Sequence, residues 1–339
     1  MSKKATAQFW DTAHRYLGHQ LKVIPQVSSH TIDSYRDCLN SFIDYLERVE
    51  NISRKKISFH NFGKETIKRY QTWMITEQGL APKTCNLRLT AIRSFLEYAA
   101  QEYLWLMPVY TDACTIAGVK TPNHAIEYFE PDEMTALLAA PSGTSRTDRR
   151  NQMMLIFLYD TAARVAEARQ VKVSDLHLDA GVPYVTLLGK GRKYRNIPLM
   201  EKTVLHLKRY LKDFHRSDPK TDLPLFYAKA HGLLHELSSD TFEKMIKRYA
   251  EQCREGGYPM PDRVHCHMIR KTRAMDLYRE GVPLPHIQQL LGHENISTTS
   301  GFYAFATLDV LAKAMEAVNP DNGVKSWSDP DILERLYRL

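Results

Sequence analysis

The sequence has no long apolar run and few cysteines, and each absence excludes a class of protein. No segment approaches the roughly 18 consecutive apolar residues that a membrane-spanning helix needs, so we expect no membrane partner. The chain begins without an apolar signal core, which predicts a cytoplasmic protein. The five cysteines are scattered and form no C-x-x-C pair, which argues against a disulfide framework and against a zinc site. We therefore expect no metal and no other cofactor.

What the sequence does contain is a surplus of positive charge. Its 46 lysines and arginines outnumber 39 acidic residues, so the net charge is +7 at pH 7. Such a balance favours a polyanionic partner, because each contact with a phosphate releases counterions from DNA. On charge alone, a basic protein without a nucleic-acid partner is equally compatible. The length of 339 residues is too great for one average core and predicts two domains.

The first part of the chain, residues 1–110, is predicted to be helical throughout. Three segments repeat apolar side chains at helical spacing: 28–49, 63–79 and 84–105. A bundle of four or five helices with basic edges is the expected result. From Met107 onward the periodicity breaks, and two prolines, a glycine and mixed polarity predict an interdomain linker at 111–126. Basic helix faces are usually solvated surface, so the bundle alone does not establish DNA binding.

The second part is predicted to mix helices with one small β-sheet. A helix begins near Pro131, because proline favours the first turn of a helix. Residues 141–150 are expected to form a polar loop, and residues 151–171 an apolar helix interrupted near Thr161. Residues 182–199 have the β-branched residues and the glycine-flanked turn of a β-hairpin. Further helices are expected at 201–214, 238–253, 267–281, 283–293 and 307–318.

Charged groups interrupt the apolar segments of this second part at four places. In chain order they are Arg164, Lys190, His267 with Arg270, and His293, and Tyr303 follows ten residues after the last. Taken singly, each has an ordinary structural explanation. Arg164 could pair with Glu167 three residues on, and a lysine between two glycines at a hairpin turn is usually exposed. No single residue among them establishes a catalytic site.

Together and in this order, these residues resemble the signature of the tyrosine recombinase (phage-integrase) family. The family pattern is an arginine, a lysine in a hairpin, His-x-x-Arg, Gly-His and a tyrosine near the C-terminus. The surrounding segments LYDTAARVAEARQV, GKGRKYRNIPL and HMIRKTRAMDLYREGVPLPHIQQLLGHENISTT are similar to the family as well. So are TIDSYRDCLNSFIDYL and RLTAIRSFLEYA in the first part. The resemblance extends from about residue 30 to residue 318.

The resemblance implies a mainly α-helical protein with an α+β catalytic domain. Its expected parts are a helical core-binding, DNA-binding domain at 1–110, the linker at 111–126, the catalytic domain at 127–325 and a helix for exchange between protomers at 326–339. The implied activity is site-specific recombination through a 3′-phosphotyrosyl intermediate, without metal or ATP. We favour integration or excision of a mobile element. The implied partners are double-stranded DNA and a homotetramer on two duplexes.

The resemblance also implies roles for individual residues. Arg164 and Arg270 would clamp the non-bridging oxygens of the phosphate that is cut. Lys190 would protonate the departing 5′ oxygen as a general acid. Additional contacts to DNA are expected from Lys83, Arg88, Arg93, Arg192 and Lys193.

The identity of the nucleophile depends on one interval. The family's tyrosine usually stands nine residues after Gly-His, and that position here is Phe302. We favour Tyr303, because a small residue and a predicted helix follow it directly and Gly301 lets the turn absorb one extra residue. His267 and His293 would accept or share its proton, since both titrate near neutrality.

The sequence departs from the usual family residues at two further places. Thr-Ala-Ala-Arg replaces the usual Thr-Gly-Leu-Arg before and at Arg164, which we take as harmless because the residues stay small. Lys271 stands where many members have histidine.

If Phe302 occupies the nucleophile position, the chain is a site-specific DNA-binding protein with impaired catalysis. A type IB topoisomerase shares the same chemistry and is the second alternative.

Overall fold

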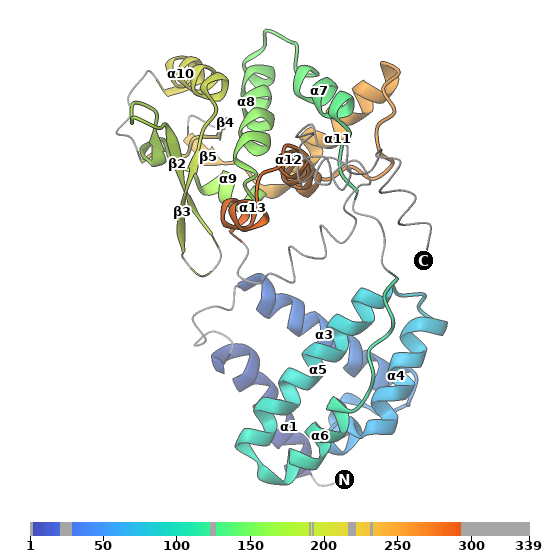
Figure 1. The fold of residues 1–339 in the computed structure, drawn as a ribbon. Coiled ribbons are helices and arrows are strands. Elements are labelled where there is room, and N and C mark those ends of the chain that lie inside the picture. Colours follow the sequence, from blue (N-terminus) through green and yellow to red (C-terminus); the bar gives the residue numbers. More distant parts are fainter. Residues whose placement is uncertain are drawn as a thin grey trace, which may run out of the picture. The chain divides into compact units, whose positions relative to one another are not determined.

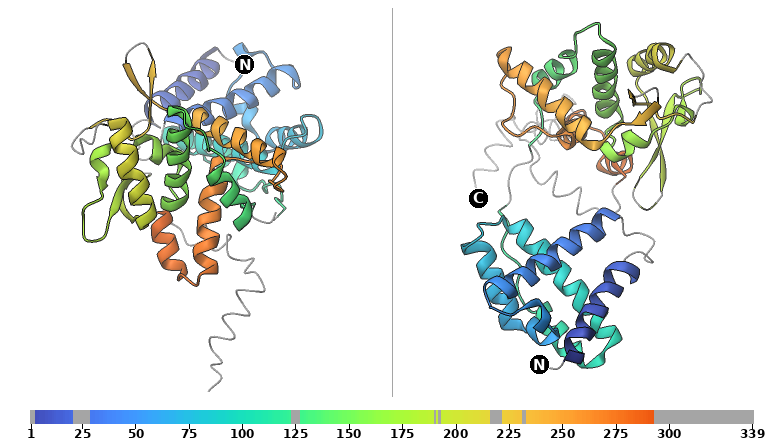
Figure 2. Two further views of the ribbon diagram at one scale, coloured as in Figure 1. Left: turned by 90° about the horizontal axis from the view of Figure 1, so that it is seen from above. Right: turned by 180° about the vertical axis from the view of Figure 1, so that it is seen from behind.

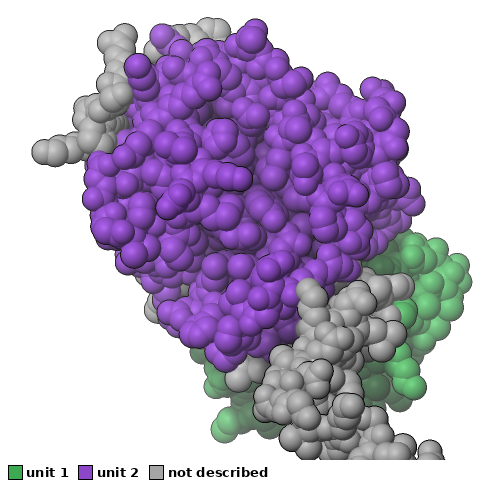
Figure 3. Space-filling model, turned by 45° about the horizontal axis from the view of Figure 1, so that its top comes forward, with its two compact units in different colours: residues 1–124 green, residues 125–339 purple. Residues whose placement is uncertain are grey.

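The computed structural model divides into two compact units, residues 1–124 and residues 125–339, which Figure 3 colours separately. The residues it describes are 3–20, 29–122, 127–189, 191, 193–215, 222–230 and 233–292. Several expected features lie outside them: Lys190, Arg192, His293, Phe302, Tyr303 and the helices expected at 307–318 and 326–339. Within the described part of the chain, no helix is long and apolar enough to cross a membrane.

The first unit is a bundle of helices around one apolar core (Figure 1). Fully buried aromatic rings form its centre, where the ring centroids of Phe42 and Phe62 are 4.8 Å apart and those of Phe62 and Phe95 are 5.9 Å apart. Close aromatic packing of this kind stabilises a bundle beyond its burial of area. Its helices are α1 (Lys3–Arg15), η1 (Tyr16–Gln20), α3 (Ser29–Arg48), η2 (Arg54–Lys56), η3 (Phe59–Phe62), α4 (Lys64–Thr76), α5 (Pro82–Glu102), η4 (Leu104–Leu106) and α6 (Met107–Cys114).

Helix α6 continues past position 110, so four of its residues lie in the segment 111–126 that was predicted to be a linker. Pro108 lies in the first turn of α6, where its missing N–H costs no helix hydrogen bond. Arg93 on α5 donates from Nε to the carbonyl oxygen of Ala113 at 3.1 Å and from Nη2 to that of Ile116. The sequence pattern did not reveal this helix, because its proline was taken as a sign of a linker.

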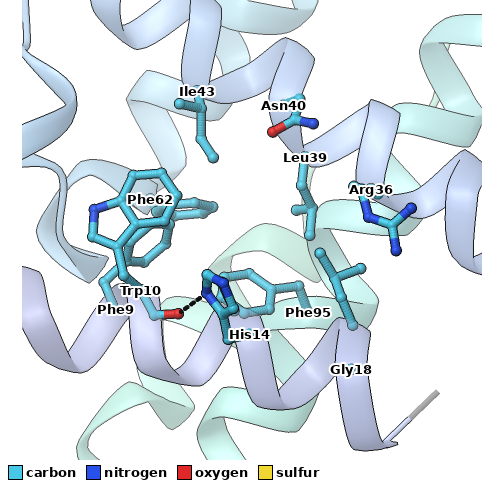
Figure 4. Close-up of a pocket in the computed structure, with 12 residues that line it drawn as sticks. Phe9, Trp10, His14, Gly18, Arg36, Leu39, Asn40, Ile43, Phe62 and Phe95 are labelled. Atoms are coloured by element: carbon cyan, nitrogen blue, oxygen red, sulfur yellow. Dashed lines mark hydrogen bonds between the residues drawn. The ribbon is translucent and has the colours of Figure 1, made fainter. Parts of the chain in front are cut away.

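An apolar pocket of about 380 Å³ lies between α1 and α3 (Figure 4). Phe62 and Phe95 form part of its wall, and the polar groups of Arg36 and Asn40 also line it. The His14 Nδ1 atom is 3.1 Å from the carbonyl oxygen of Trp10, which holds that ring beside the apolar wall. None of the described residues to which the resemblance assigns a role in catalysis or in DNA contact lines this pocket.

In the second unit, helix α8 packs against α7, α10 and α12 (Figure 2). Its helices are α7 (Pro131–Ala139), α8 (Arg146–Thr161), α9 (Val165–Gln170), η5 (Val173–Asp175), α10 (Glu201–His215), α11 (Ser239–Glu255), α12 (Cys266–Arg279) and α13 (Leu284–Leu291). Its strands are β1 (Leu176–His177), β2 (Tyr184–Leu188), β3 (Tyr194–Pro198), β4 (Tyr227–Ala230) and β5 (Leu233–Glu236). The predicted class, mainly helical with small antiparallel sheets, is confirmed. The hairpin of β4 and β5 was not expected.

The hairpin of β2 and β3 extends from the body of this unit (Figure 1). In its antiparallel register Leu188 pairs with Tyr194, and the Gly189 N–H closes the turn by donating to the carbonyl oxygen of Lys193 at 2.8 Å. Strand β1 adds to the other edge of β2. The predicted hairpin is therefore confirmed.

The polar loop expected at 141–150 is shorter than predicted, because α8 begins at Arg146. Ser145 caps this helix: its hydroxyl oxygen accepts a hydrogen bond from the Asp148 N–H at 3.0 Å. The predicted interruption near Thr161 is confirmed. Ala162 ends α8 in a left-handed conformation, with φ 48° and ψ 29°, and α9 begins at Val165.

Candidate active site

Arg164 stands at the N-terminal cap of α9, two residues after the left-handed Ala162 ends α8. Glu167 in the first turn of α9 accepts hydrogen bonds from the Arg164 backbone N–H and from its Nη1, both at 2.8 Å. The side chain of Arg164 is nevertheless 34% exposed. Glu167 thus fixes the direction of this guanidinium group while part of it still faces solvent.

Arg270 on α12 is the most enclosed charged group of the site, with 3% of its side chain exposed. Its Nη1 donates to the carbonyl oxygen of Ala162 at 2.8 Å, and its Nη2 donates to that of Leu291. Burial, together with the positive charge of Arg164, lowers the pKa of Arg270 to about 9, which leaves it protonated at neutral pH. Arg270 therefore joins the C-terminal ends of α8 and α13.

Glu167 is the centre of this group of charges. Arg195 on β3 donates from Nη1 and Nη2 to the two carboxylate oxygens of Glu167 at 2.9 and 2.8 Å, and Arg270 Nη1 lies 3.9 Å from one of them. Burial acts to raise the pKa of Glu167, but the hydrogen bonds from Arg195 and Arg164 outweigh it and lower the value to about 2. Three guanidinium groups against one carboxylate leave a net formal charge of +2.

Arg195 also contacts the turns that precede two motif positions. Its Nε donates to the carbonyl oxygen of Leu290 at 3.0 Å. A Cβ atom added at Gly189 would lie 3.2 Å from Arg195 Nη1, and one added at Gly292 would lie 3.2 Å from Arg195 Cδ. Both glycines therefore lie against the same side chain. Gly292 has φ +60°, a conformation that glycine adopts without strain.

His267, in the first turn of α12, lies on the same helix as Arg270. Although part of its imidazole is exposed, burial of the remainder and the positive charges of Arg270 and Lys271 lower the pKa of His267 to about 4. The ring of His265 lies parallel to it, with the centroids 6.4 Å apart. This low pKa corrects the expectation that His267 titrates near neutrality: the imidazole is neutral at pH 7 and is a weaker proton acceptor than an ordinary histidine.

The residues expected to contact DNA are divided between the two units. Lys83, Arg88 and Arg93 all lie on α5 of the first unit. Lys83 is exposed and Arg88 is half-buried, whereas the guanidinium group of Arg93 holds the end of α6. Lys193 is exposed beside β3 in the second unit. The structure thus brings together Arg164, Arg270 and His267 within the second unit, whereas the basic residues of α5 belong to the first unit.

Sequence reasoning missed the roles of Glu167 and Arg195. Glu167 was considered only as an ordinary partner for Arg164, although its place three residues into a short helix is where an acid reaches back to the helix start. Arg195 and Ile197 are two residues apart on β3, so their side chains lie on the same face, the buried side of the hairpin. A charged residue at an inward-facing strand position was the signal that could have identified it.

Both units match known protein families. Residues 127–307 match the phage integrase family, and residues 15–103 match the SAM-like N-terminal domain of phage integrases. The chain is 30% identical to the putative integrase/recombinase y4rC of Sinorhizobium fredii, over 90% of both chains. It is 33% identical to the tyrosine recombinase XerD of Halalkalibacterium halodurans, over 83% of this chain and 89% of the relative.

A solved structure shares the fold. The XerH site-specific recombinase bound to its palindromic difH substrate superposes with a TM-score of 0.67, at 22% identity, covering 86% of this chain and 80% of that one. The family match alone spans more than half of the chain and includes every described residue of the arginine cluster. The chain therefore belongs to the phage integrase family of tyrosine recombinases.

Proposed function

We propose that this recombinase integrates or excises a mobile DNA element, cutting and rejoining duplex DNA through a 3′-phosphotyrosyl link. The observation that supports the chemistry most is the arginine cluster around Glu167. It combines an enclosed guanidinium group, Arg270, with a partly exposed one, Arg164, around a single carboxylate. A surplus of fixed positive charge beside an exposed arginine is suited to bind a phosphodiester.

The charge of the cluster suits the transition state better than the ground state. A phosphodiester carries one negative charge, and attack by a deprotonated tyrosine adds a second. Fixed guanidinium groups stabilise this increase without reorganising, because Glu167 and the carbonyl oxygens already hold them in place. In this proposal Arg164 and Arg270 bind the two non-bridging oxygens.

In each direction, the proposed reaction forms one P–O bond, breaks another and transfers two protons. The hydroxyl oxygen of Tyr303 attacks phosphorus, its proton passes to His267 or His293, and a new P–O bond to the protein forms. The bond from phosphorus to the 5′ oxygen breaks, and Lys190 supplies the proton that makes a free 5′-hydroxyl. Reversal with a different 5′-hydroxyl rejoins the strand. The phosphodiester energy is retained, so ATP is not needed.

The mobile-element role and the assembly are proposed on narrower grounds. The relative in Sinorhizobium fredii is named an integrase/recombinase, and this chain departs from the usual family residues at Ala162 and Lys271. We propose that four protomers act on two duplexes and that residues 326–339 of each dock on the next. In the helix that the sequence predicts there, one side would carry Ile332, Leu333, Leu336 and Leu339, and a helix this short needs a surface to be stable.

A nicked suicide duplex tests the proposed chemistry. The 5′-hydroxyl fragment diffuses away after cleavage, so a covalent adduct accumulates and can be mapped by peptide digestion. We expect a phosphotyrosyl peptide at Tyr303, none in Tyr303→Phe, and Holliday junctions with intact duplexes. The absence of an adduct, with activity restored by Phe302→Tyr, would identify an impaired DNA-binding protein. An adduct without strand exchange would identify a topoisomerase.

A further inference from the structure

Arg195 connects three segments that are distant in the sequence. Its fork binds Glu167 on α9, its Nε binds the carbonyl oxygen of Leu290 at the end of α13, and its backbone belongs to β3 of the hairpin. Only 13% of its side chain is exposed. Each of its three guanidinium nitrogens donates to an acceptor within the protein, so these internal contacts define what Arg195 does.

The two turns beside Arg195 carry the residues to which the proposed chemistry assigns proton transfer. Lys190 directly follows Gly189, and His293 directly follows Gly292. The backbone of both glycines lies close enough to Arg195 that an added Cβ would meet its side chain at 3.2 Å. The side chain of Arg195 is thus a common support for the attachment points of both residues.

We propose that Arg195 is a positioning residue for proton transfer: it fixes the backbone of Gly189 and Gly292, the residues that precede Lys190 and His293 in the chain, relative to the arginine pair. This inference rests on the proposed function, in which Lys190 protonates the 5′ oxygen. Arg195 binds Glu167, which also binds Arg164, so one side chain sets the distance between the phosphate clamp and the hairpin. Proton transfer is sensitive to such distances, because donor and acceptor must approach within hydrogen-bond range.

Lysine cannot replace arginine in this role. The three nitrogens of Arg195 bind three acceptor atoms at once, namely the two oxygens of Glu167 and the carbonyl oxygen of Leu290. A lysine ammonium is a point charge on a flexible stem and lacks this planar fork. Arg195→Lys therefore keeps the charge of the cluster and removes the geometric constraint, which separates positioning from electrostatics.

The test compares cleavage of an ordinary duplex with cleavage of one that has sulfur at the bridging 5′ position. A thiolate leaves without a proton, so this substrate does not need the general acid. We expect Arg195→Lys to slow cleavage of the ordinary duplex by roughly 10²-fold, the lower end for a lost general acid. The sulfur substrate should recover most of that rate. Duplex affinity should stay within about twofold.

Two reference variants make the outcomes distinguishable. The cleavage rate of Lys190→Ala on the sulfur substrate, relative to its rate on the ordinary duplex, sets the recovery expected when the general acid is lost. If this variant shows no recovery, the role of Lys190 in the proposed function is wrong. Arg169→Lys removes another arginine that binds a backbone carbonyl, that of Leu237, and should leave both rates unchanged. If Lys190→Ala recovers with sulfur but Arg195→Lys is equally slow on both substrates, the positioning role of Arg195 is overturned.

A milder variant covers the case in which Arg195→Lys does not fold. Gly189→Ala adds a methyl group 3.2 Å from Arg195 Nη1 at a position whose φ alanine can adopt. It should slow the ordinary duplex several-fold and be recovered by sulfur in the same way. A loss of rate on both substrates alike would contradict the proposal for this variant too.

Discussion

Glu167 and Arg195 form a two-point ion pair, in which both carboxylate oxygens accept hydrogen bonds from the two terminal nitrogens of the guanidinium group, at 2.9 and 2.8 Å. The side chains are 4% and 13% exposed. Parallel hydrogen bonds between ions fix an orientation as well as a distance. Removing either partner would leave the other charge enclosed without its counterion, so this pair is where the stability of the site can be measured.

Glu167→Ala should lower the free energy of unfolding by about 3–5 kcal/mol, because it leaves Arg195 and Arg270 buried without their carboxylate. Urea unfolding measures this change. The control is Glu236→Ala, which removes a 52% exposed acid whose pair with Arg169 is 3.7 Å long. We expect less than about 1 kcal/mol there. Equal losses in the two variants would contradict the central role of Glu167.

Acid should remove the contribution of Glu167 in a defined range. Its pKa falls from an ordinary 4.5 to about 2 in the folded protein, so the stabilisation is complete above pH 4.5 and is lost as the pH falls towards 2. Glu167→Gln lacks this ionisation. The stability advantage of the natural protein over Glu167→Gln should shrink by on the order of 3 kcal/mol between pH 5 and pH 2. A constant difference would show that Glu167 titrates normally.

The imidazole of His267 should titrate well below 6.5, near 4, in the absence of DNA. NMR of the ring carbons follows this titration. Lys271→Gln removes one of the positive charges that lower this pKa and should raise it, whereas Lys271→Arg should leave it unchanged. A bound duplex adds a phosphate anion and should also raise it. A value near 6.5 in the free protein would show that the ring is solvated.

Gly292→Ala should destabilise the second unit by about 1–2 kcal/mol. The cost arises from placing an alanine in the left-handed region at φ +60° and from the methyl group that meets Arg195. Gly281→Ala is the matched control, since Gly281 also has a positive φ, +82°, but a Cβ there has no neighbour within 4 Å. Thermal unfolding of both variants decides whether the close contact at Gly292 has an energetic cost.

Deleting residues 326–339 tests the proposed assembly. We expect binding of one protomer to a single site to be unchanged, and the pairing of two duplexes to be lost, because the apolar stripe of this segment would dock on a neighbour. Gel mobility with one and two binding sites separates the two effects. Normal pairing of duplexes by the shortened chain would show that the segment docks on its own protomer.

Much of the fold could be predicted because periodicity is a direct signal of burial. The break after Thr161 and the hairpin around Gly189 were both anticipated, and the helices of the second unit recur as expected up to α13. Helix α6 and the strands β4 and β5 were not anticipated, because Pro108 in α6 was taken as a break and β5 is exposed along its whole length, so it has no buried face to produce an apolar pattern. Tertiary contacts decide such segments.

The charged site was harder to predict, for a different reason. Arg164 and Arg270 could be found because their order along the chain matches a family. Glu167 and Arg195 act through hydrogen bonds to other protein groups, and no local pattern states which acceptor an arginine will choose. The sequence also did not reveal the cost of having alanine at position 162, where the family usually has glycine. The structure places Ala162 in the left-handed region, where alanine is strained by about 1–2 kcal/mol.

The single carboxylate of Glu167 has a consequence for how the protein opens. It ties the start of α9 to β3, and through Arg195 and Arg270 it reaches the end of α13. If one of these segments detached, the others would lose their charge balance. The backbone amides of the three segments should therefore exchange with solvent deuterium together, at one rate, rather than fraying independently. The site would then be either fully assembled or fully open.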